Sequence, residues 1–233
     1  VATTNPNANI NNTFLLSDLP DFTVHEEDRE RPSERALATR LASYAAVEAS
    51  DPYTVATTEL VKAITDVQGR EIYWSDLTSL SLHNKSLKSL HNLGEHCARI
   101  ERLDVSSNAL TQLDGVPLFV RELNARSNQL VSLTSWTHLM HLQYLDISSN
   151  GLESLDGLGH LIHLRELRVD SNRIRRLDGI ADLDGLITLS ARNNSIRELN
   201  FEQFRFGRVV EMDVSDNQIT RIQGLEGLSS LRT

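Results

Sequence analysis

Apolar residues recur along the chain from Leu77 onward at an interval longer than one helical turn or one strand period. Within each recurrence they occupy the first, fourth, sixth, eleventh and fourteenth positions, and a polar residue, usually asparagine, occupies the ninth. The first positions are Leu77, Ile100, Val120, Leu142, Leu164, Leu186, Val209 and Leu231. They lie 20 to 23 residues apart. An amphipathic helix would need a spacing near 3.6, so the pattern predicts stacked coils, one per unit.

The spacing inside one unit predicts its local structure. A short strand places the fourth and sixth positions inward and their neighbours outward. The asparagine at the ninth position is expected to bond backbone groups of the turn and of neighbouring coils. A further apolar residue, sixteen after each start, marks the return segment: Leu93, Val116, Trp136, Leu158, Ile180 and Leu225. A unit of this length leaves no room for a full return helix.

The predicted fold class is therefore α/β, a leucine-rich-repeat solenoid with a curved parallel sheet on its concave face and short 3₁₀ or loop returns on its convex face. Residues 77–233 hold seven units, and an eighth opens at Leu231 and is cut off at Thr233, which indicates truncation. The first unit has Lys85 in place of asparagine. The sixth unit has three phenylalanines, Phe201, Phe204 and Phe206, which we expect to fill a widened gap.

The N-terminal third lacks this period. Residues 1–32 predict a disordered or extended strap, whose small apolar cluster around Leu19 is either part of a loose linker or a docking segment. A helix is expected over 33–50, and Asp51-Pro52 breaks it. The first repeat has no coil before it and would expose its core to solvent, so residues 33–76 are predicted to form a helical N-terminal cap.

The second half of this cap is predicted in more detail. Thr58 begins a shorter helix through Val67, which Gly69 closes. Ile72-Tyr73-Trp74 follows as a candidate edge strand.

Charge and cysteine usage narrow the function. The 233 residues have a formal net charge of -9, which argues against binding to nucleic acid or to an anionic membrane. The single cysteine, Cys97, cannot form the disulfide caps of a secreted repeat protein, so we expect an intracellular chain and a packed thiol. The sequence has neither a run of 18 apolar residues nor a charged-then-apolar leader, so no bilayer span or signal peptide is expected.

The outward strand positions predict a polar concave face with mixed charge. Its candidate partner-binding residues are Arg102, Arg126, Tyr144, Asp146, Arg168 and Arg192. Such a face suits an extended or phosphorylated peptide, because guanidinium groups bind phosphate and Tyr and Arg are enriched in binding hot spots. Two alternatives stay open. In one, Arg126, Arg168 and Arg192 pair with the nearby carboxylates of Asp146, Glu166 and Asp170 in a solvated lattice; in the other, Tyr144 merely covers strand backbone.

Other clusters carry less specific chemistry. A secondary basic cluster, Arg173, Arg175 and Arg176, is either a solvated edge or a contact for an acidic or phosphorylated partner. Four histidines recur at the repeat spacing, namely His138, His141, His160 and His163. They lack a carboxylate or thiol column, so no metal site is expected. Because no phosphate-binding glycine loop or nucleophile elbow occurs either, we expect no cofactor and no enzyme activity.

Several stretches resemble one family within the 22-residue class. They are Arg102–Ser106, Leu133–Trp136, Leu142–Ser148, His163–Leu167, Leu177–Ile180 and Leu183–Leu186. These are similar to the fungal spindle-pole-body scaffold of the septation-initiation and mitotic-exit network, and centriolin has a similar region in animals. The resemblance covers about residues 70–233 and, more weakly, the strap before them.

The resemblance implies a protein-interaction module in the cytoplasm and cytoskeleton, at the spindle pole body. Its implied partners are a spindle-pole coiled-coil anchor, or the kinases and GTPase of the signalling cascade. Two alternatives come from other classes. A protein phosphatase 1 regulatory subunit would need a continuous acidic and aromatic concave patch. An extracellular recognition domain would need cysteine caps.

Overall fold

The structure is a computed structural model that describes residues 52–68 and 73–232. The chain divides into two compact units, Val1–Ala45 and Ala46–Thr233, and all described residues belong to the second. The predicted strap over 1–32, the predicted helix over 33–50, and the positions Gly69 and Ile72 lie outside the described residues.

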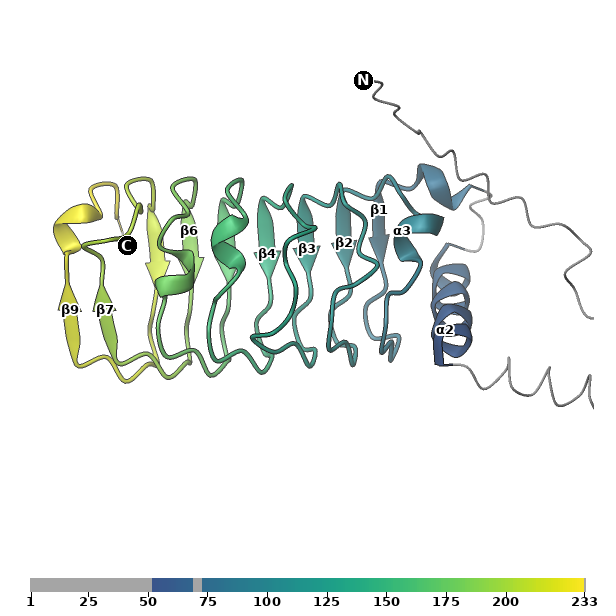
Figure 1. The fold of residues 1–233 in the computed structure, drawn as a ribbon, viewed down its shortest axis with the longest axis horizontal. Helices are drawn as coiled ribbons and strands as arrows, with labels where there is room; N and C mark the ends of the chain where they lie inside the picture. The colour runs from purple at the N-terminus through teal and green to yellow at the C-terminus, as the bar shows by residue number, and fades with distance from the viewer. Residues whose placement is uncertain (1–51, 69–72, 233) are drawn as a thin grey trace, which may run out of the picture. The chain divides into compact units, whose positions relative to one another are not determined.

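A parallel sheet of seven strands runs the length of the solenoid, with one strand in each coil (Figure 1). Its strands are β1 (Ser79–Ser81), β2 (Arg102–Asp104), β3 (Glu122–Asn124), β4 (Tyr144–Asp146), β5 (Glu166–Arg168), β6 (Thr188–Ser190) and β8 (Glu211–Asp213). The middle residues pair in register from Leu80 with Leu103 through to Leu189 with Met212. This arrangement confirms the predicted fold class.

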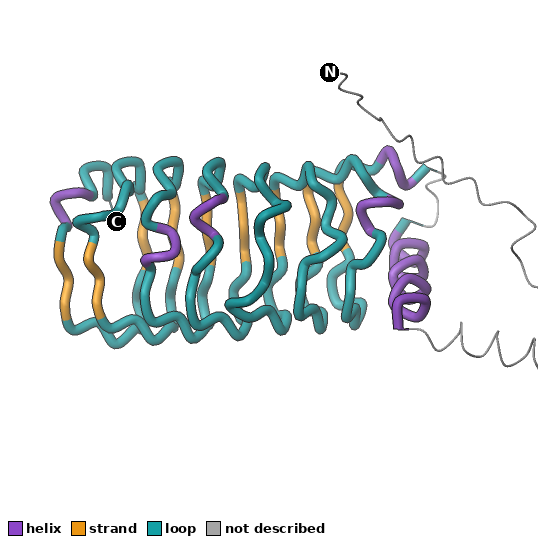
Figure 2. The backbone as a smooth tube through the Cα atoms, viewed as in Figure 1, coloured by secondary structure: helices purple, strands orange, loops and turns teal. Residues whose placement is uncertain are grey.

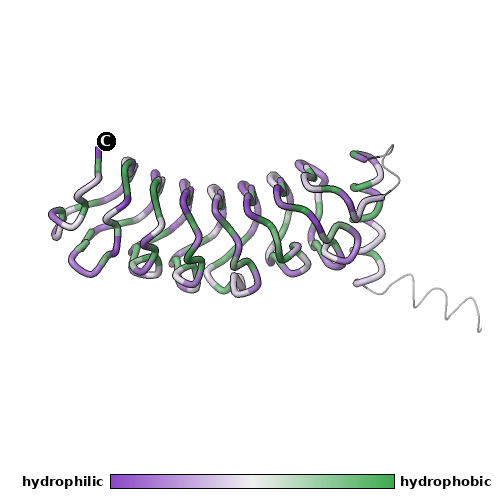
Figure 3. Tube along the Cα trace, turned by 90° about the horizontal axis from the view of Figure 1, so that it is seen from above, coloured by the Kyte–Doolittle hydropathy of each residue, from purple (hydrophilic) through white to green (hydrophobic). Residues whose placement is uncertain are grey.

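The returns are mostly loop, as expected from the unit length (Figure 2). The short helical pieces are α3 (Leu93–His96), η4 (Leu158–His160), η5 (Asp178–Ile180) and η6 (Leu225–Gly227). The return column is buried at Leu93, Val116, Trp136, Leu158 and Ile180. Leu225 differs and is 54% exposed, because no further coil within the described residues covers it. Each coil repeats the same alternation of hydrophobic and hydrophilic segments (Figure 3).

An asparagine ladder links successive coils through backbone groups. Asn172 is representative: its side-chain nitrogen donates to the carbonyl oxygens of Val169 at 3.0 Å, Asp170 at 3.2 Å and Ile147 of the preceding coil at 3.1 Å. Its side-chain oxygen accepts the N–H of Leu152 at 3.1 Å. The other five members are Asn108, Asn128, Asn150, Asn194 and Asn217. One side chain thus satisfies backbone groups of two coils, as the repeat pattern predicted.

The described part of the cap is helix α2 (Pro52–Val67), which begins six residues earlier than the predicted start at Thr58. Proline is well suited to the first turn of a helix, because its missing N–H has no intrahelical partner there. Leu60, with Ala63 and Ile64 one helical turn later, is buried in the core shared with the coils. On the same helix, Asp66 lies 4.0 Å from Lys85, the residue that replaces asparagine in the first unit.

The predicted edge strand at Ile72–Trp74 is wrong for its described residues. Trp74–Asp76 form a 3₁₀ turn, η3, whose C-cap N–H, that of Leu77, bonds the Trp74 carbonyl at 3.2 Å. The ring of Trp74 packs edge-on against His96, with ring centroids 6.2 Å apart. Consecutive aromatic residues favour a strand, but Trp74 reaches its packing partner His96 from a 3₁₀ turn, so no strand is needed.

Two fourteenth positions, both expected to point inward, face solvent. Leu133 is 87% exposed, because the N–H of Thr134 closes a tight turn onto the Val131 carbonyl at 3.0 Å and Thr134 takes the buried place. Ile222, in the last unit, is 48% exposed.

A second parallel sheet occupies the return side of the sixth and seventh coils. It pairs β7 (Glu198–Asn200) with β9 (Arg221–Gln223) and was not predicted. Beside it lie the three phenylalanines, whose ring centroids are 4.8 to 6.3 Å apart. Phe201 and Phe206 are buried and Phe204 is half-buried, so they form a small aromatic core within this return.

We predict that Asn172→Ala lowers the free energy of unfolding by about 3 kcal/mol, because it leaves the N–H of Leu152 unpaired at a buried site and removes three further bonds to carbonyl groups of two coils. Asn200→Ala is the matched control: its side chain is exposed and accepts a single bond, from the N–H of Glu202. We expect the control to cost less than about 1 kcal/mol. Urea denaturation followed by circular dichroism measures both, and equal losses would contradict a structural role for the ladder.

Candidate functional site

A shallow groove runs across the outward side chains of β1 to β5, with a volume of about 350 Å³. It includes four of the six predicted partner-binding residues, Arg102, Tyr144, Asp146 and Arg168. Arg126 and Arg192 lie on the same face, two residues beyond the ends of β3 and β6, and do not line it. The groove arises because parallel strands in register place equivalent side chains in straight rows.

Tyr144 stands near the middle of this groove. It is 41% exposed, and its register neighbours on the adjoining strands are Glu122 and Glu166. The ring therefore offers apolar area between two carboxylates. This position suits a contact residue for a partner that brings a basic or hydrogen-bonding side chain.

The four predicted arginines of this face differ in how they are paired. Arg168 Nε lies 2.7 Å from Glu166 Oε1, and Arg192 Nε lies 2.8 Å from Asp216 Oδ2. The hydrogen bond to Asp216 raises the pKa of Arg192. These two side chains fit the lattice alternative, although Asp216 was not among its expected carboxylates.

The other two arginines have unpaired charges. Within the described residues, neither Arg102 nor Arg126 has a carboxylate close enough for an ion pair. Among the predicted arginines of the face, these two can therefore accept an anionic partner group without losing an existing pair.

The acidic residues at the strand ends hold their own turns. Asp146 Oδ1 accepts the N–H of Ser148 at 2.9 Å, and Asp104 and Asp213 accept from Ser106 and Ser215 in the same way. The hydroxyl and N–H of Ser215 lower the pKa of Asp213. Two arginines and four carboxylates line the groove, so its formal charge is -2. This charge favours a basic or neutral peptide in the groove over a phosphorylated one.

A separate basic groove of about 720 Å³ lies on the return side, beside β7 and β9. Arg175 and Arg176 line it, together with Arg197 and Arg221, which sequence analysis did not single out, and Arg173 does not. Arg175 pairs with Glu153 at 3.7 Å and Arg176 with Asp178 at 2.5 Å. The pairing of β7 with β9, which a repeat consensus does not indicate, brings the two additional arginines here.

The remaining chemistry of the described residues is sparse. No group of three or more metal-ligating side chains gathers within residues 52–68 and 73–232. No helix in those ranges is long and apolar enough to cross a bilayer. Cys97 is fully buried, and burial raises the pKa of its thiol to about 11.

Comparison with known proteins identifies the repeat and one relative. The Leucine Rich repeat family matches residues 138–157. The septation initiation network scaffold protein cdc11 of Schizosaccharomyces pombe is 43% identical over 108 residues, which are 46% of this chain and 10% of that protein. The match thus spans a small part of the relative. It confirms the resemblance drawn from the repeat sequences.

Solved structures share the fold. An internalin of Listeria monocytogenes superposes with a TM-score of 0.60 at 23% identity, over 68% of this chain and 47% of that one. A leucine-rich-repeat protein of Leptospira interrogans gives 0.61 at 24%, over 69% and 43%. The leucine-rich-repeat domain of a Shigella effector gives 0.53 at 26%, over 78% and 76%. These likenesses support the solenoid.

We predict that Cys97 resists a thiol-specific disulfide dye at about pH 8 while the chain is folded, because the reactive thiolate is scarce and buried. Dye release should appear only with unfolding in urea. The raised pKa also means that stability falls as pH rises from 9 towards 11, since the unfolded thiol ionises first. Rapid stoichiometric labelling of the folded chain would contradict this.

Proposed function

We propose that this leucine-rich-repeat chain is a non-catalytic module. It anchors septation and mitotic-exit signalling components at the spindle pole body. The 43% identity over 108 residues carries the proposal. Its partners would then be a coiled-coil anchor of the pole or the kinases and GTPase of the cascade. The same kinship supports a cytoplasmic, cytoskeletal location.

The concave groove supports a binding role for this module. It combines one exposed aromatic ring at its middle, one unpaired guanidinium at Arg102, and rows of hydrogen-bonding side chains at the strand spacing. An extended segment of a partner protein fits such rows, because its side chains alternate in direction and those on one side can follow the strands. We place the main contact at Tyr144 and Arg102.

Two other partner classes have less support. A phosphorylated peptide finds its best support at Arg126, outside the groove, where no described carboxylate pairs with the guanidinium. The phosphatase alternative has no support from the relative, whose name is that of a septation scaffold.

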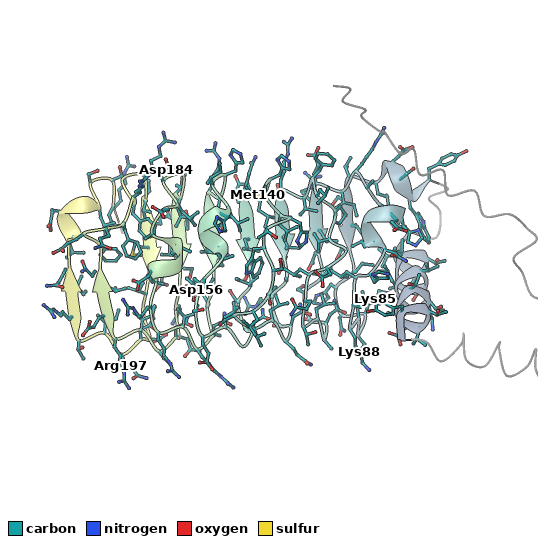
Figure 4. All side chains as sticks on the ribbon, in the orientation of Figure 1. Lys85, Lys88, Met140, Asp156, Asp184 and Arg197 are labelled. Atoms are coloured by element: carbon teal, nitrogen blue, oxygen red, sulfur yellow. The ribbon has the colours of Figure 1, made fainter. Side chains whose placement is uncertain are left out.

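Affinity purification from mitotic fungal extract tests the proposal, with the chain as bait and mass spectrometry as readout. Tyr144→Ala with Arg102→Glu should reduce recovery of spindle-pole and cascade proteins by about 30-fold, the effect of losing about 2 kcal/mol at a binding hot spot. Lys88→Glu is the control, because Lys88 is exposed and lies on the lower edge of the solenoid (Figure 4). It should recover the same proteins as wild type.

Two results would count against the proposal in different ways. Equal recovery by the groove variant would move the site away from the concave groove and keep the scaffold role. Recovery of a phosphatase 1 catalytic subunit in place of spindle-pole proteins would overturn the scaffold role itself.

A further inference from the structure

A row of apolar side chains occupies three successive turn tips at the edge of the solenoid. In these coils the first position of the unit donates its N–H to a carbonyl three residues earlier, from Val120 to Pro117, from Leu142 to Leu139, and from Leu164 to Leu161, at 2.9 to 3.3 Å. The two residues inside each turn therefore project from the coil. They are Leu118-Phe119, Met140-His141 and Ile162-His163, which we call the turn-tip row.

The turn-tip row has apolar residues where tight turns usually have polar ones. Residues inside tight turns are usually polar or glycine. The equivalent turn of the next coil follows that rule with Asp184-Gly185, and the preceding coil has Ala98-Arg99. In the row, Leu118 is 57% exposed, Phe119 59%, Met140 40% and Ile162 55%.

The core does not use these side chains. Anchoring residues of two of these turns, Leu139 and Leu161, are fully buried and already fill the interior. Phe119 stacks on His141 within the row, with ring centroids 5.7 Å apart, and the row otherwise exposes large apolar groups outside the core. Such a contiguous patch marks an interaction surface.

Strand register makes the row straight and gives it a period. Leu118, Met140 and Ile162 each lie four residues before a paired strand, and Glu122, Tyr144 and Glu166 pair in register. Figure 4 shows Met140 and Asp184 along one edge, opposite Lys88 and Arg197. Neighbouring strands are about 4.8 Å apart, so the three apolar tips span roughly 10 Å.

This period selects the shape of the ligand. Successive turns of an α-helix repeat every 5.4 Å or so, and two turns span about 11 Å, close to the length of the row. An extended strand repeats a face about every 6.7 Å, and would be about 4 Å out of step after two repeats. A helix laid along the edge is the better match.

Charge beside the row selects the polar part of that ligand. A hollow of about 190 Å³ next to Ile162 is lined by Arg165 and Arg208, and neither forms an ion pair within the described residues. His163 and Asp184 complete its rim. An acidic side chain on the ligand would gain two guanidinium partners there.

We propose that the turn-tip row binds an amphipathic helix of a partner protein. The helix presents an apolar stripe at spacings i, i+3 or i+4, and i+7 to Leu118, Met140 and Ile162. An acidic residue at its end enters the hollow between Arg165 and Arg208. This surface is separate from the concave groove and does not depend on the function proposed for it.

A displayed library of random 16-residue helical peptides tests this with the full 233-residue chain as target. The library is first depleted on the double variant Leu118→Glu, Ile162→Glu, then selected on wild type. Enriched peptides should carry the apolar spacing above and one or more acidic residues. For one enriched peptide, synthesised and measured by fluorescence anisotropy, the Kd should be about tenfold higher with the double variant than with wild type. This is the effect expected from losing two buried contacts.

Matched variants separate the row from general effects of added charge. Ser75→Glu places the same charge four residues before β1, at an exposed site two coils from Leu118, and should leave the Kd unchanged. Arg165→Glu should weaken acidic winners and leave neutral ones unaffected. All substituted side chains are exposed, so thermal unfolding should stay at the wild-type temperature and confirm that each variant folds.

Three outcomes would overturn the proposal. The selection enriches nothing over the depleted background, it enriches peptides without the helical spacing, or winners bind the double variant as well as wild type. Sedimentation equilibrium adds a fourth: a wild-type dimer that the double variant abolishes would assign the row to a second copy of the chain.

Discussion

Several backbone groups of each coil find their partner only in a neighbouring coil, as the N–H of Leu152 does with Asn172, and this constraint shapes the whole solenoid. An isolated coil of this length would leave carbonyls and N–H groups buried and unbonded, which is costly. Each ladder asparagine bonds backbone groups of two coils at once: carbonyl groups of its own coil, and one carbonyl and one N–H of the coil before it, as Asn172 does. The stability of the solenoid therefore depends on the stacking of its coils, and a single coil would not be stable alone.

The ends of the ladder differ because only one neighbour is available. In the first unit, the ninth position holds Lys85, whose ammonium lies 4.0 Å from Asp66 on α2. An ion pair with the cap thus stands where the other units have an asparagine. At the other end, Ile222 and Leu225 remain exposed in the last described coil. The central coils, with neighbours on both sides, are the ones that display both the concave groove and the turn-tip row.

The repeat period predicts every feature that depends on where a residue falls within its unit. Inward positions, the asparagine bonds, seven parallel strands and the residues of the concave face all follow from where a residue falls in its unit. Local events broke the pattern: a tight turn placed Leu133 in solvent, and proline at the first turn started α2 at Pro52. The period does not predict side-chain pairing either, since Arg192 forms its ion pair with Asp216 and not with the carboxylates expected beside it. The polar character of the concave face is predictable from the repeat, but its groove and the net negative charge of that groove depend on which side chains meet in three dimensions.

The small sheet of β7 and β9 has a consequence for the path of the molecule. In most coils, strand hydrogen bonds set the separation on the concave side alone, so the return side is free to fan outward and the stack follows a shallow arc (Figure 3). The sixth and seventh coils are held by strand pairing on both sides, β6 to β8 and β7 to β9. Pairing on two sides fixes the angle between these two coils. They should thus move as one stiff unit, to which a long ligand that follows the arc would have to adapt.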